Sequence, residues 1–248
     1  MTPYDVIVVG GGAAGLMAAI IARRQGASVF VCEKMPKLGK KLLVTGAGRC
    51  NLLNEKLDPS FYDPTVQEIV KTVFAEFGKQ KILGFFRELG LEVCAEPDGR
   101  IFPVTNQAAS VVKVLEMELE RLKVEVRLNY EIERIAGGSG GFELKAGKGQ
   151  GAKGKAVILC AGGKSYPALG AAGGGYDIAG RFGHTIHEPV PATVPLLVKD
   201  PWCHHLQGQK IRAVASALVR GEKVAEAAGE VLFAQYGLSG TAILDISR

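Results

Sequence analysis

The N-terminal region alternates between apolar runs and one glycine-rich turn. Residues Asp5–Val9 form a mostly β-branched run, which is typical of a central parallel strand buried on both faces. Gly10–Gly15 predicts a turn, residues 16–25 predict an apolar helix ending before Gly26, and Ser28–Glu33 predicts a second strand. A strand, a helix and a strand within about 30 residues predict one βαβ unit.

The pattern continues with helices and short strands. Apolar residues recur at helical spacing within residues 107–122, which predicts an amphipathic helix. Pro97-Asp98-Gly99 predicts the turn of a hairpin. Further helices are predicted over residues 66–77 and 80–89, and further strands over residues 91–94, 101–104, 124–128, 131–136, 142–145 and 156–160. Gly147–Lys155 is rich in glycine and lysine, which predicts an exposed loop.

The character of the sequence changes beyond residue 190. Four prolines between Pro189 and Pro201 indicate an exit from an α/β domain, and Ile211–Val224 predicts antiparallel strands. We therefore expect an α/β domain over residues 1–190, with a parallel sheet and a small antiparallel insertion. Residues 191–248 are expected to begin a second, β-rich domain that is incomplete.

Composition and charge narrow the class of protein. Apolar residues make up 47% of the 248-residue chain, which predicts a substantial core. The five cysteines form no C-x-x-C pair, which disfavours a zinc site or a disulfide framework and favours the reducing cytoplasm. The apolar run Val6–Ala22 contains three consecutive glycines and is short for a membrane span, so no membrane segment is expected. The net charge of +5 permits an anionic ligand without requiring one.

The glycine-rich turn contains the sequence motif that indicates a binding site. Gly10, Gly12 and Gly15 form a G-x-G-x-x-G fingerprint directly after a strand, with Ala13 and Ala14 opening the helix. In such fingerprints the first glycine permits a tight turn, the second admits a pyrophosphate, and the third lets the helix pack on the strand. The free N–H groups and dipole of the helix start favour phosphate.

An acidic residue follows the fingerprint at the expected place. Glu33 ends the second strand, where a carboxylate can accept hydrogen bonds from the ribose of an adenosine. FAD and NAD share this ADP half. FAD is favoured because residues 34–54 form a long basic excursion through Thr45–Asn51, because a strand ends in Ala161-Gly162-Gly163, and because residues 107–122 resemble a flavoprotein insertion.

Several longer segments resemble a known family. They are "VIVVGGGAAGLMAA", "EKMPKLGKKLLVTGAGRCNLLN", "VILCAGGKSYPALGAAGGGY", "VPATVPLLV" and "GEVLFAQYGLSGTAIL". Together they resemble the bacterial NAD(P)/FAD-dependent oxidoreductases related to bile-acid ene-reductases. The resemblance implies a β-rich second domain from Pro191 and a small helical one from about Gly229. Family members continue into a glycine-rich segment that closes over the flavin, and the sequence ending at Arg248 is expected to lack it.

The resemblance and the motifs together define a candidate cofactor site. The resemblance implies that Gly10, Gly12, Gly15, Glu33, Lys34, Gly48, Arg49, Cys50, Asn51 and Gly162 line the FAD site and that Ile132 meets the adenine. The fingerprint, the basic excursion and the strand end add Ala13, Ala14, Lys40, Thr45, Ala161 and Gly163.

Other reactive side chains are assigned no catalytic role. Cys50 has no neighbouring cysteine and is interpreted as a packed small side chain. The histidines at 184, 187, 204 and 205 have no cysteine or carboxylate at zinc spacing, so no metal is expected. Ser165 and Tyr166 could face the substrate side of a flavin, although an ordinary loop is an equal interpretation.

The leading hypothesis is an FAD-dependent oxidoreductase that moves a hydride between the flavin and a small organic substrate. Residues 170–175 lack the strand that a second fingerprint needs, so NAD(P)H as donor would have to visit the flavin directly. Three alternatives stay open: an FAD protein of RNA modification, a plain NAD-dependent dehydrogenase, and a fragment without cofactor. A nucleic-acid partner is disfavoured because residues 34–49 contain no aromatic side chain.

Overall fold

The computed structural model describes residues 2–138 and 140–247. The chain divides into two compact units, Met1–Ile186 and His187–Arg248. Each unit has its own sheet and its own apolar core. The two units are therefore described separately.

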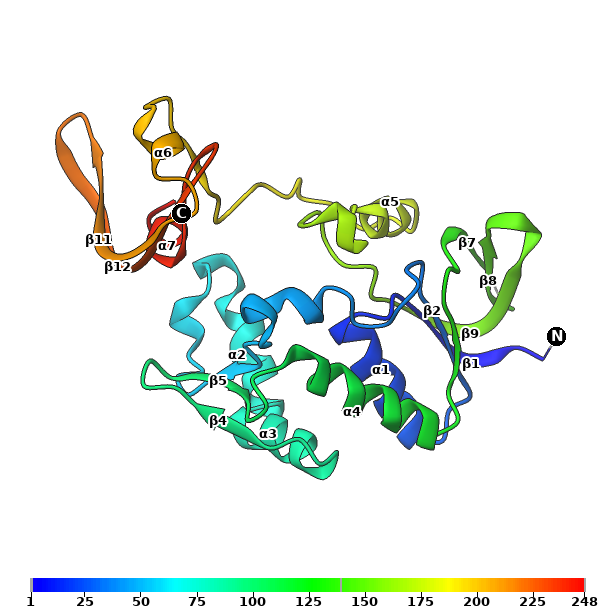
Figure 1. Cartoon of the computed structure of the whole chain (residues 1–248). Coiled ribbons are helices and arrows are strands. Elements are labelled where there is room, and N and C mark those ends of the chain that lie inside the picture. Colours follow the sequence, from blue (N-terminus) through cyan, green and yellow to red (C-terminus); the bar gives the residue numbers. More distant parts are fainter. Residues whose placement is uncertain (1, 139, 248) are drawn as a thin grey trace. The chain divides into compact units, whose positions relative to one another are not determined.

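A six-stranded mixed sheet organises the first unit (Figure 1). Its strand order is β6-β2-β1-β9-β8-β7, with β6, β2, β1 and β9 parallel and β8 and β7 antiparallel. The strands are β1 Tyr4–Val9, β2 Val29–Cys32, β6 Glu125–Arg127, β7 Ile132–Gly138, β8 Gly141–Ala146 and β9 Gly151–Leu159. After β1 the chain goes first to β2 on one side and later to β9 on the other, so the strand order reverses at β1. The carboxyl ends of parallel strands at such a point are where ligands bind in open α/β sheets.

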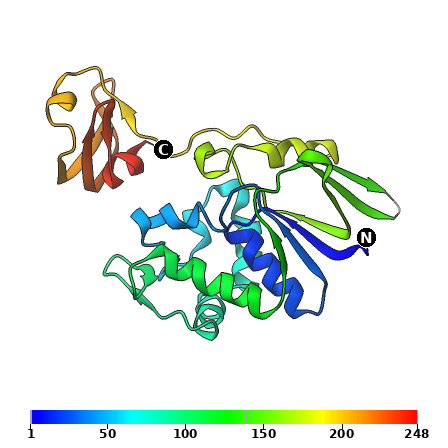
Figure 2. The ribbon, with the colours of Figure 1, turned by 45° about the vertical axis from the view of Figure 1, so that its right-hand side comes forward.

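Helices cover both faces of this sheet (Figure 2). Helices α1 (Ala13–Arg24) and α4 (Ala108–Arg121) pack on the face that carries Val8 and Val31. Helix α5 (Gly174–Arg181) contributes Ile178 to the core on the opposite face. Side chains alternate between the faces of a strand, so the apolar and buried runs at residues 7–9 of β1 and Val29–Cys32 of β2 contact both layers. The expected α/β fold is confirmed.

The expected loop over Gly147–Lys155 is wrong for most of its length. Strand β9 begins at Gly151 and pairs with both β1 and β8. Glycine disfavours strands, and this composition hid the element. A Cβ on Gly154 would lie 2.8 Å from Ile7 Cγ1, so the absence of a side chain there makes room for the core side chain of β1.

A smaller antiparallel sheet lies in the same unit. It contains β3 (Leu53–Asn54), β5 (Arg100–Pro103) and β4 (Val93–Ala95) in that order. Strands β4 and β5 form the hairpin expected around Pro97-Asp98-Gly99, with Cys94 opposite Phe102. The remaining helices are η1 Leu42–Gly48, η2 Pro59–Phe61, η3 Pro64–Val66, α2 Gln67–Glu76, α3 Lys79–Glu88, η4 Gly147–Gly149 and η5 Pro167–Leu169.

A buried carboxylate joins α1 to α4. Glu118 on α4 is 5% exposed and accepts hydrogen bonds from Arg24 of α1 at 2.9 Å and from Arg121 at 2.7 Å. These bonds, with that from Arg121 the stronger, outweigh burial and lower the pKa of Glu118 to about 2. The pairing therefore stabilises the packing of the two helices only while Glu118 is ionised.

The Glu118→Gln variant is expected to lose about 1–3 kcal/mol of unfolding free energy at pH 7, because two guanidinium groups lose their shared anion. A depressed carboxyl pKa contributes stability above the ordinary value of 4.5, and this contribution is lost as pH falls toward 2. Urea unfolding of the parent and the variant at pH 7 and pH 3 measures this contribution to the free energy of unfolding. The difference between parent and variant should shrink at pH 3, while the exposed control Glu120→Gln should match the parent at both pH values.

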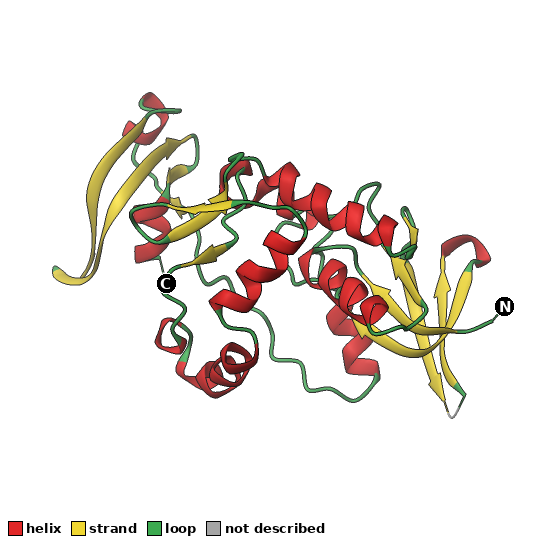
Figure 3. Ribbon diagram, turned by 90° about the horizontal axis from the view of Figure 1, so that it is seen from below, coloured by secondary structure: helices red, strands yellow, loops and turns green. Residues whose placement is uncertain are grey.

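The second unit is built on a four-stranded antiparallel sheet of order β10-β13-β12-β11. The strands are β10 Leu196–Leu197, β11 Lys210–Val219, β12 Glu222–Ala234 and β13 Gly237–Ser239, and the helices are α6 Trp202–His205 and α7 Thr241–Ile246. Figure 3 shows the long β11–β12 hairpin as a pair of yellow ribbons. Val231 packs with Ala242 and Ile243 of α7 in the core of this unit.

The resemblance implied that a helical domain begins at about Gly229, and this starting point is wrong. Gly229 lies within β12 opposite Ala213 of β11, and the strand continues to Ala234. A Cβ on Gly229 would lie 2.6 Å from Thr241 Oγ1, so this glycine permits α7 to cross the hairpin closely. Thr241 Oγ1 also accepts a hydrogen bond from the Glu230 amide at 2.9 Å. The segment is a strand with a helix packed on it.

Within residues 2–138 and 140–247, no helix combines the length and apolar character that a membrane crossing requires.

Candidate functional site

A pocket of about 250 Å³ opens at the carboxyl ends of β1, β2 and β9, in the first unit. Its position coincides with the reversal of strand order at β1. Four segments line it: the glycine turn, the basic segment after β2, the start of β7, and the loop and helix after β9. The lining residues are Val9, Gly10, Gly11, Gly12, Cys32, Glu33, Lys34, Met35, Lys40, Lys41, Tyr130, Glu131, Ile132, Glu133, Cys160, Ala161, Gly162, Leu169, Gly170, Ala171, Gly174, Gly175, Asp177, Ile178 and Arg181.

The glycines of the fingerprint have different surroundings. A Cβ on Gly10 would lie 2.3 Å from the Cys160 carbonyl oxygen, and Gly10 has a positive φ of 110°. Gly12 precedes the first residue of α1, has an ordinary φ of −82°, and a Cβ there would meet nothing within 4 Å. Gly10 is therefore required by the fold, whereas Gly12 leaves open the space in front of the helix start, where the free N–H groups favour an anion.

Glu33 lies beside the glycine turn and is 9% exposed. Its Oε2 accepts a hydrogen bond from the Gly11 amide at 2.6 Å, and its Oε1 accepts one from the Met35 amide at 2.7 Å. The carboxylate thus fixes both the turn and the start of the basic segment. Each carboxylate oxygen can accept a further hydrogen bond, so Glu33 can also receive ribose hydroxyls.

Three lysines of the basic segment line the pocket: Lys34, Lys40 and Lys41. Lys34 Nζ lies 3.8 Å from Glu131 Oε1. Lys41 Nζ donates hydrogen bonds to Ser165 Oγ at 2.6 Å and to the Ser165 carbonyl oxygen at 3.2 Å. These cations and the helix start make this part of the pocket suitable for a phosphate-bearing ligand.

The structure brings about half of the predicted cofactor residues to the pocket. Those that line it are Gly10, Gly12, Glu33, Lys34, Lys40, Ile132, Ala161 and Gly162. Those that do not are Ala13, Ala14, Gly15, Thr45, Gly48, Arg49, Cys50, Asn51 and Gly163. The first set comprises the nucleotide-binding features, and most of the second belongs to the segment expected to approach the flavin.

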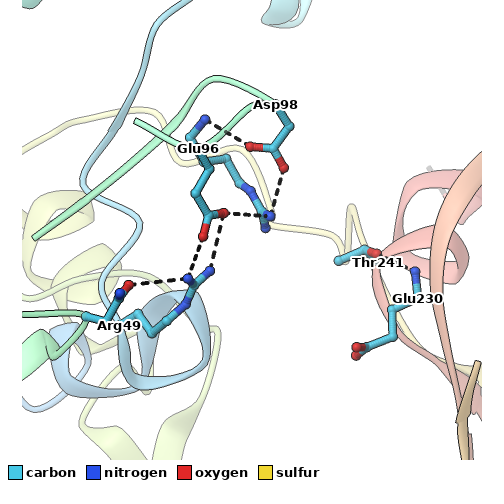
Figure 4. A network of polar contacts seen from close by, with 7 residues as sticks. Arg49, Glu96, Asp98, Glu230 and Thr241 are labelled. Carbon is cyan, nitrogen blue, oxygen red and sulfur yellow. Dashed lines mark hydrogen bonds and ion pairs between the residues drawn. The ribbon is translucent and has the colours of Figure 1, made fainter. Parts of the chain in front are cut away.

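The Thr45–Asn51 segment is held by the small sheet. Arg49 Nη1 lies 2.6 Å from Glu96 Oε1 (Figure 4). The guanidinium carbon of Arg49 lies 3.9 Å from the centre of the Phe102 ring. A Cβ on Gly46 would lie 2.6 Å from the Asn51 amide, which shows how tightly this turn is folded. Arg49 therefore stabilises the segment in this structure, and its contact with a flavin stays a prediction.

The sequence patterns missed the wall formed by Leu169–Ala171 and helix α5. Residues 174–181 contain three glycines and no long apolar repeat, so helical spacing gives little signal. The run of glycines and alanines at 170–175 was the available signal, because small residues allow a ligand to approach the backbone. Gly170 and Gly173 have positive φ angles of 96° and 88°.

The cysteines near the pocket are unreactive thiols. Burial raises the pKa of Cys32 to about 12 and also raises the pKa of Cys160. Cys50 is 2% exposed, and burial raises its pKa as well. These groups are thiols at neutral pH and are not nucleophiles. Among the residues that the structure describes, no group of three His, Cys, Asp or Glu side chains is placed to hold a metal ion.

Comparisons with known proteins agree with this geometry. The chain matches the family described as the HI0933-like protein Rossmann domain over residues 4–240. It is 41% identical over 243 residues to the 3-dehydro-bile acid delta(4,6)-reductase of Clostridium scindens, covering 97% of this chain and 59% of the relative. It is 30% identical over 247 residues to the ribosomal RNA dihydrouridine synthase of Escherichia coli, covering 100% of this chain and 61% of the relative.

A solved structure shows the same fold. The 3-ketosteroid-delta4-(5alpha)-dehydrogenase of Rhodococcus jostii RHA1 gives a TM-score of 0.52 at 19% identity, covering 66% of this chain and 47% of that chain. The fold and the position of the pocket define a Rossmann-type dinucleotide-binding domain. The chain belongs to the HI0933-like Rossmann family, as the resemblance implied. It spans about three fifths of the length of the curated relatives that it matches.

Proposed function

We propose that this chain binds FAD with the ADP half in the pocket at the end of β1, and that it serves a flavin-dependent oxidoreductase. The observation that carries the proposal is the conjunction of Gly12 and Glu33. Gly12 leaves open space at the start of α1, and the Glu33 carboxylate lies beside the same turn. This arrangement fits a pyrophosphate next to a ribose.

The residues of the pocket bind and orient the cofactor. The helix start and Lys40 meet the pyrophosphate, Glu33 receives the ribose, and the backbone around Ile132 meets the adenine. When bound, FAD supplies the acceptance and donation of a hydride. The two cysteines that line the pocket, Cys32 and Cys160, are not nucleophiles, because burial raises the pKa of both thiols.

The relatives support reduction of a carbon–carbon double bond as the reaction. The names of both matched enzymes, a delta(4,6)-reductase and a dihydrouridine synthase, describe saturation of a double bond. The higher identity, 41%, is to the enzyme that acts on a bile acid. The substrate class that follows is a small organic molecule with a double bond conjugated to a carbonyl group, with NAD(P)H as the donor that reduces the flavin.

The purified chain is expected to be yellow and to release stoichiometric FAD on denaturation, because the pocket provides the phosphate and ribose contacts together. Absorbance near the flavin band and mass analysis of the released cofactor measure this. Titration with NAD, followed by calorimetry, is expected to show no comparable binding. A colourless chain that takes up no FAD on reconstitution would remove the proposal, and tight NAD binding would replace it with a nicotinamide-dependent dehydrogenase.

RNA is the second candidate substrate. The match to ribosomal RNA dihydrouridine synthase extends over 100% of this chain, and the net charge is +5. RNA binding through lysines and arginines weakens steeply with salt. Retention of the flavin-loaded chain on ribosomal RNA at low salt, lost as salt rises, would favour this candidate over a small molecule. Absence of retention at low salt would eliminate it.

A further inference from the structure

Three backbone segments enclose the nucleotide pocket, and they are joined to one another in pairs. They are the glycine turn at residues 10–12, the basic segment at residues 34–41, and the loop at residues 160–171. Each contributes several of the lining residues. The three joints between them differ in strength, and this difference determines where the enclosure can open.

The first joint ties the basic segment to the glycine turn through the backbone. The Gly39 amide donates a hydrogen bond to the Gly11 carbonyl oxygen at 2.8 Å. A Cβ on Gly11 would lie 2.4 Å from Leu38 Cδ2, and the Leu38 side chain is 7% exposed. This joint combines a backbone hydrogen bond with buried apolar packing, so opening it would disrupt the core.

The second joint ties the loop after β9 to the glycine turn. The Cys160 amide donates to the Val9 carbonyl oxygen at 2.8 Å, as an extension of the pairing between β9 and β1. A Cβ on Gly10 would lie 2.3 Å from the Cys160 carbonyl oxygen, so the two backbones are in direct contact. This joint is part of the parallel sheet.

The third joint depends on side chains of the basic segment. Lys41 Nζ donates to Ser165 Oγ at 2.6 Å and to its carbonyl oxygen at 3.2 Å, and this bridge is exposed. Nearby, a Cβ on Gly170 would lie 3.0 Å from Met35 Cγ, so the Met35 side chain rests against the loop. A lysine and a methionine are both flexible side chains that can swing away without disturbing the sheet.

The loop that holds Ser165 also has positions suited to a hinge. Gly162 and Gly170, on either side of Ser165, have positive φ angles of 77° and 96°. Loop residues that tolerate large changes of φ and ψ are typical hinge positions. Gly162 and Gly170 are therefore the positions about which the loop would bend when the contact with Lys41 breaks.

We propose that the Lys41–Ser165 bridge is the gate through which the dinucleotide enters and leaves the pocket, and that Lys41 is a positioning residue for the loop. This inference rests on the proposed function, because it assumes that FAD occupies the pocket. A gate holds both the bound and the free pocket closed. Its loss speeds association and dissociation of FAD together and leaves the equilibrium affinity nearly unchanged. A lysine that binds the cofactor directly would instead slow dissociation without slowing association.

The experiment compares Lys41→Met, Ser165→Ala and the control Lys37→Met. Lys37 is an exposed lysine of the same basic segment that does not line the pocket. Methionine keeps an unbranched apolar stem and removes only the charge. Flavin fluorescence in stopped flow measures FAD association with each apoprotein, and release into an excess of scavenger measures dissociation from each loaded chain.

Lys41→Met is expected to raise both rates about tenfold, which corresponds to about 1.4 kcal/mol at the barrier. Ser165→Ala is expected to raise both by a smaller factor, since its carbonyl oxygen can still accept from Lys41. Faster dissociation with unchanged or slower association in Lys41→Met would show a direct cofactor contact and overturn the gate. Rates equal to those of Lys37→Met would overturn it as well. A parent chain that takes up no FAD would defeat the proposed function together with this inference, whereas normal uptake with unchanged rates defeats the inference alone.

Discussion

Gly12→Ala is expected to fold like the parent chain and to bind FAD on the order of a hundredfold more weakly, because the pyrophosphate would lose one or two charge-assisted hydrogen bonds worth about 1.5–3 kcal/mol each. A Cβ at this position meets no protein atom within 4 Å, and the φ of −82° suits any residue. The added methyl group therefore occupies only the space in front of the helix start. The substitution should therefore leave the folded structure unchanged and weaken only the binding of FAD.

Two measurements separate these effects. Thermal unfolding of the apoprotein should differ from that of the parent by less than about 1 kcal/mol, the usual range for an alanine placed where the backbone accepts it. Titration of apoprotein with FAD should show the loss of affinity. Gly84→Ala, on the exposed side of α3, is a suitable control because a Cβ there would meet nothing within 4 Å. Gly26→Ala is unsuitable because Gly26 has a positive φ of 89°. Full FAD affinity in Gly12→Ala would place the pyrophosphate elsewhere.

The βαβ unit could be predicted from sequence because every local signal there agrees. The β-branched run before Gly10, the glycines of the turn and the apolar helix each favour the observed element, and the elements differ from expectation by only a few residues at their ends. Glu33 could be placed for the same reason, since it follows directly from the end of β2. Its two backbone partners could not be predicted, because the Gly11 and Met35 amides reach it only after the turn has folded.

The contacts of the basic segment with distant parts of the chain could not be predicted from the sequence, because they depend on tertiary structure. Lys40 was an expected cofactor residue and Lys41 was not, yet Lys41 is the one that reaches Ser165, which lies 124 positions later in the chain. Neither composition nor periodicity encodes which of two adjacent lysines faces a distant loop. Arg49 shows the converse case. Its place in a glycine-rich basic segment suggested a cofactor contact, but Glu96 on the β4–β5 hairpin pairs with it in the structure.

In strand β9, glycine residues make a strand look like a loop in the sequence. Gly151 and Gly154 lower the strand propensity of the segment, and Lys153 and Lys155 give it the appearance of a solvated loop. The segment is nevertheless a strand because it pairs with two neighbours at once, β1 and β8. Backbone pairing on both edges outweighs the propensity of individual residues, and only the sheet topology reveals it.

Gly15→Ala is expected to destabilise the first unit by more than about 4 kcal/mol, the range reached only when a change disrupts the core or the backbone. A Cβ on Gly15 would lie 1.8 Å from the Gly10 carbonyl oxygen and 3.0 Å from the Gly10 carbonyl carbon. Both are backbone atoms of the turn, so no side-chain rotation can relieve the overlap. Helix α1 would have to move away from β1, which would open the packing of Leu16 and Ile20, both fully buried, against Val8.

The contrast with Gly12→Ala makes this prediction specific, since the same methyl group is added three residues apart on the same turn. Gly15→Ala should unfold at a much lower temperature than Gly12→Ala with or without FAD, or accumulate as insoluble protein. Circular dichroism of the soluble fraction, followed during heating, compares the two variants directly. A Gly15→Ala chain as stable as the parent would mean that α1 does not lie against the Gly10 carbonyl, and the close contact between helix and strand on which the pocket depends would be incorrect.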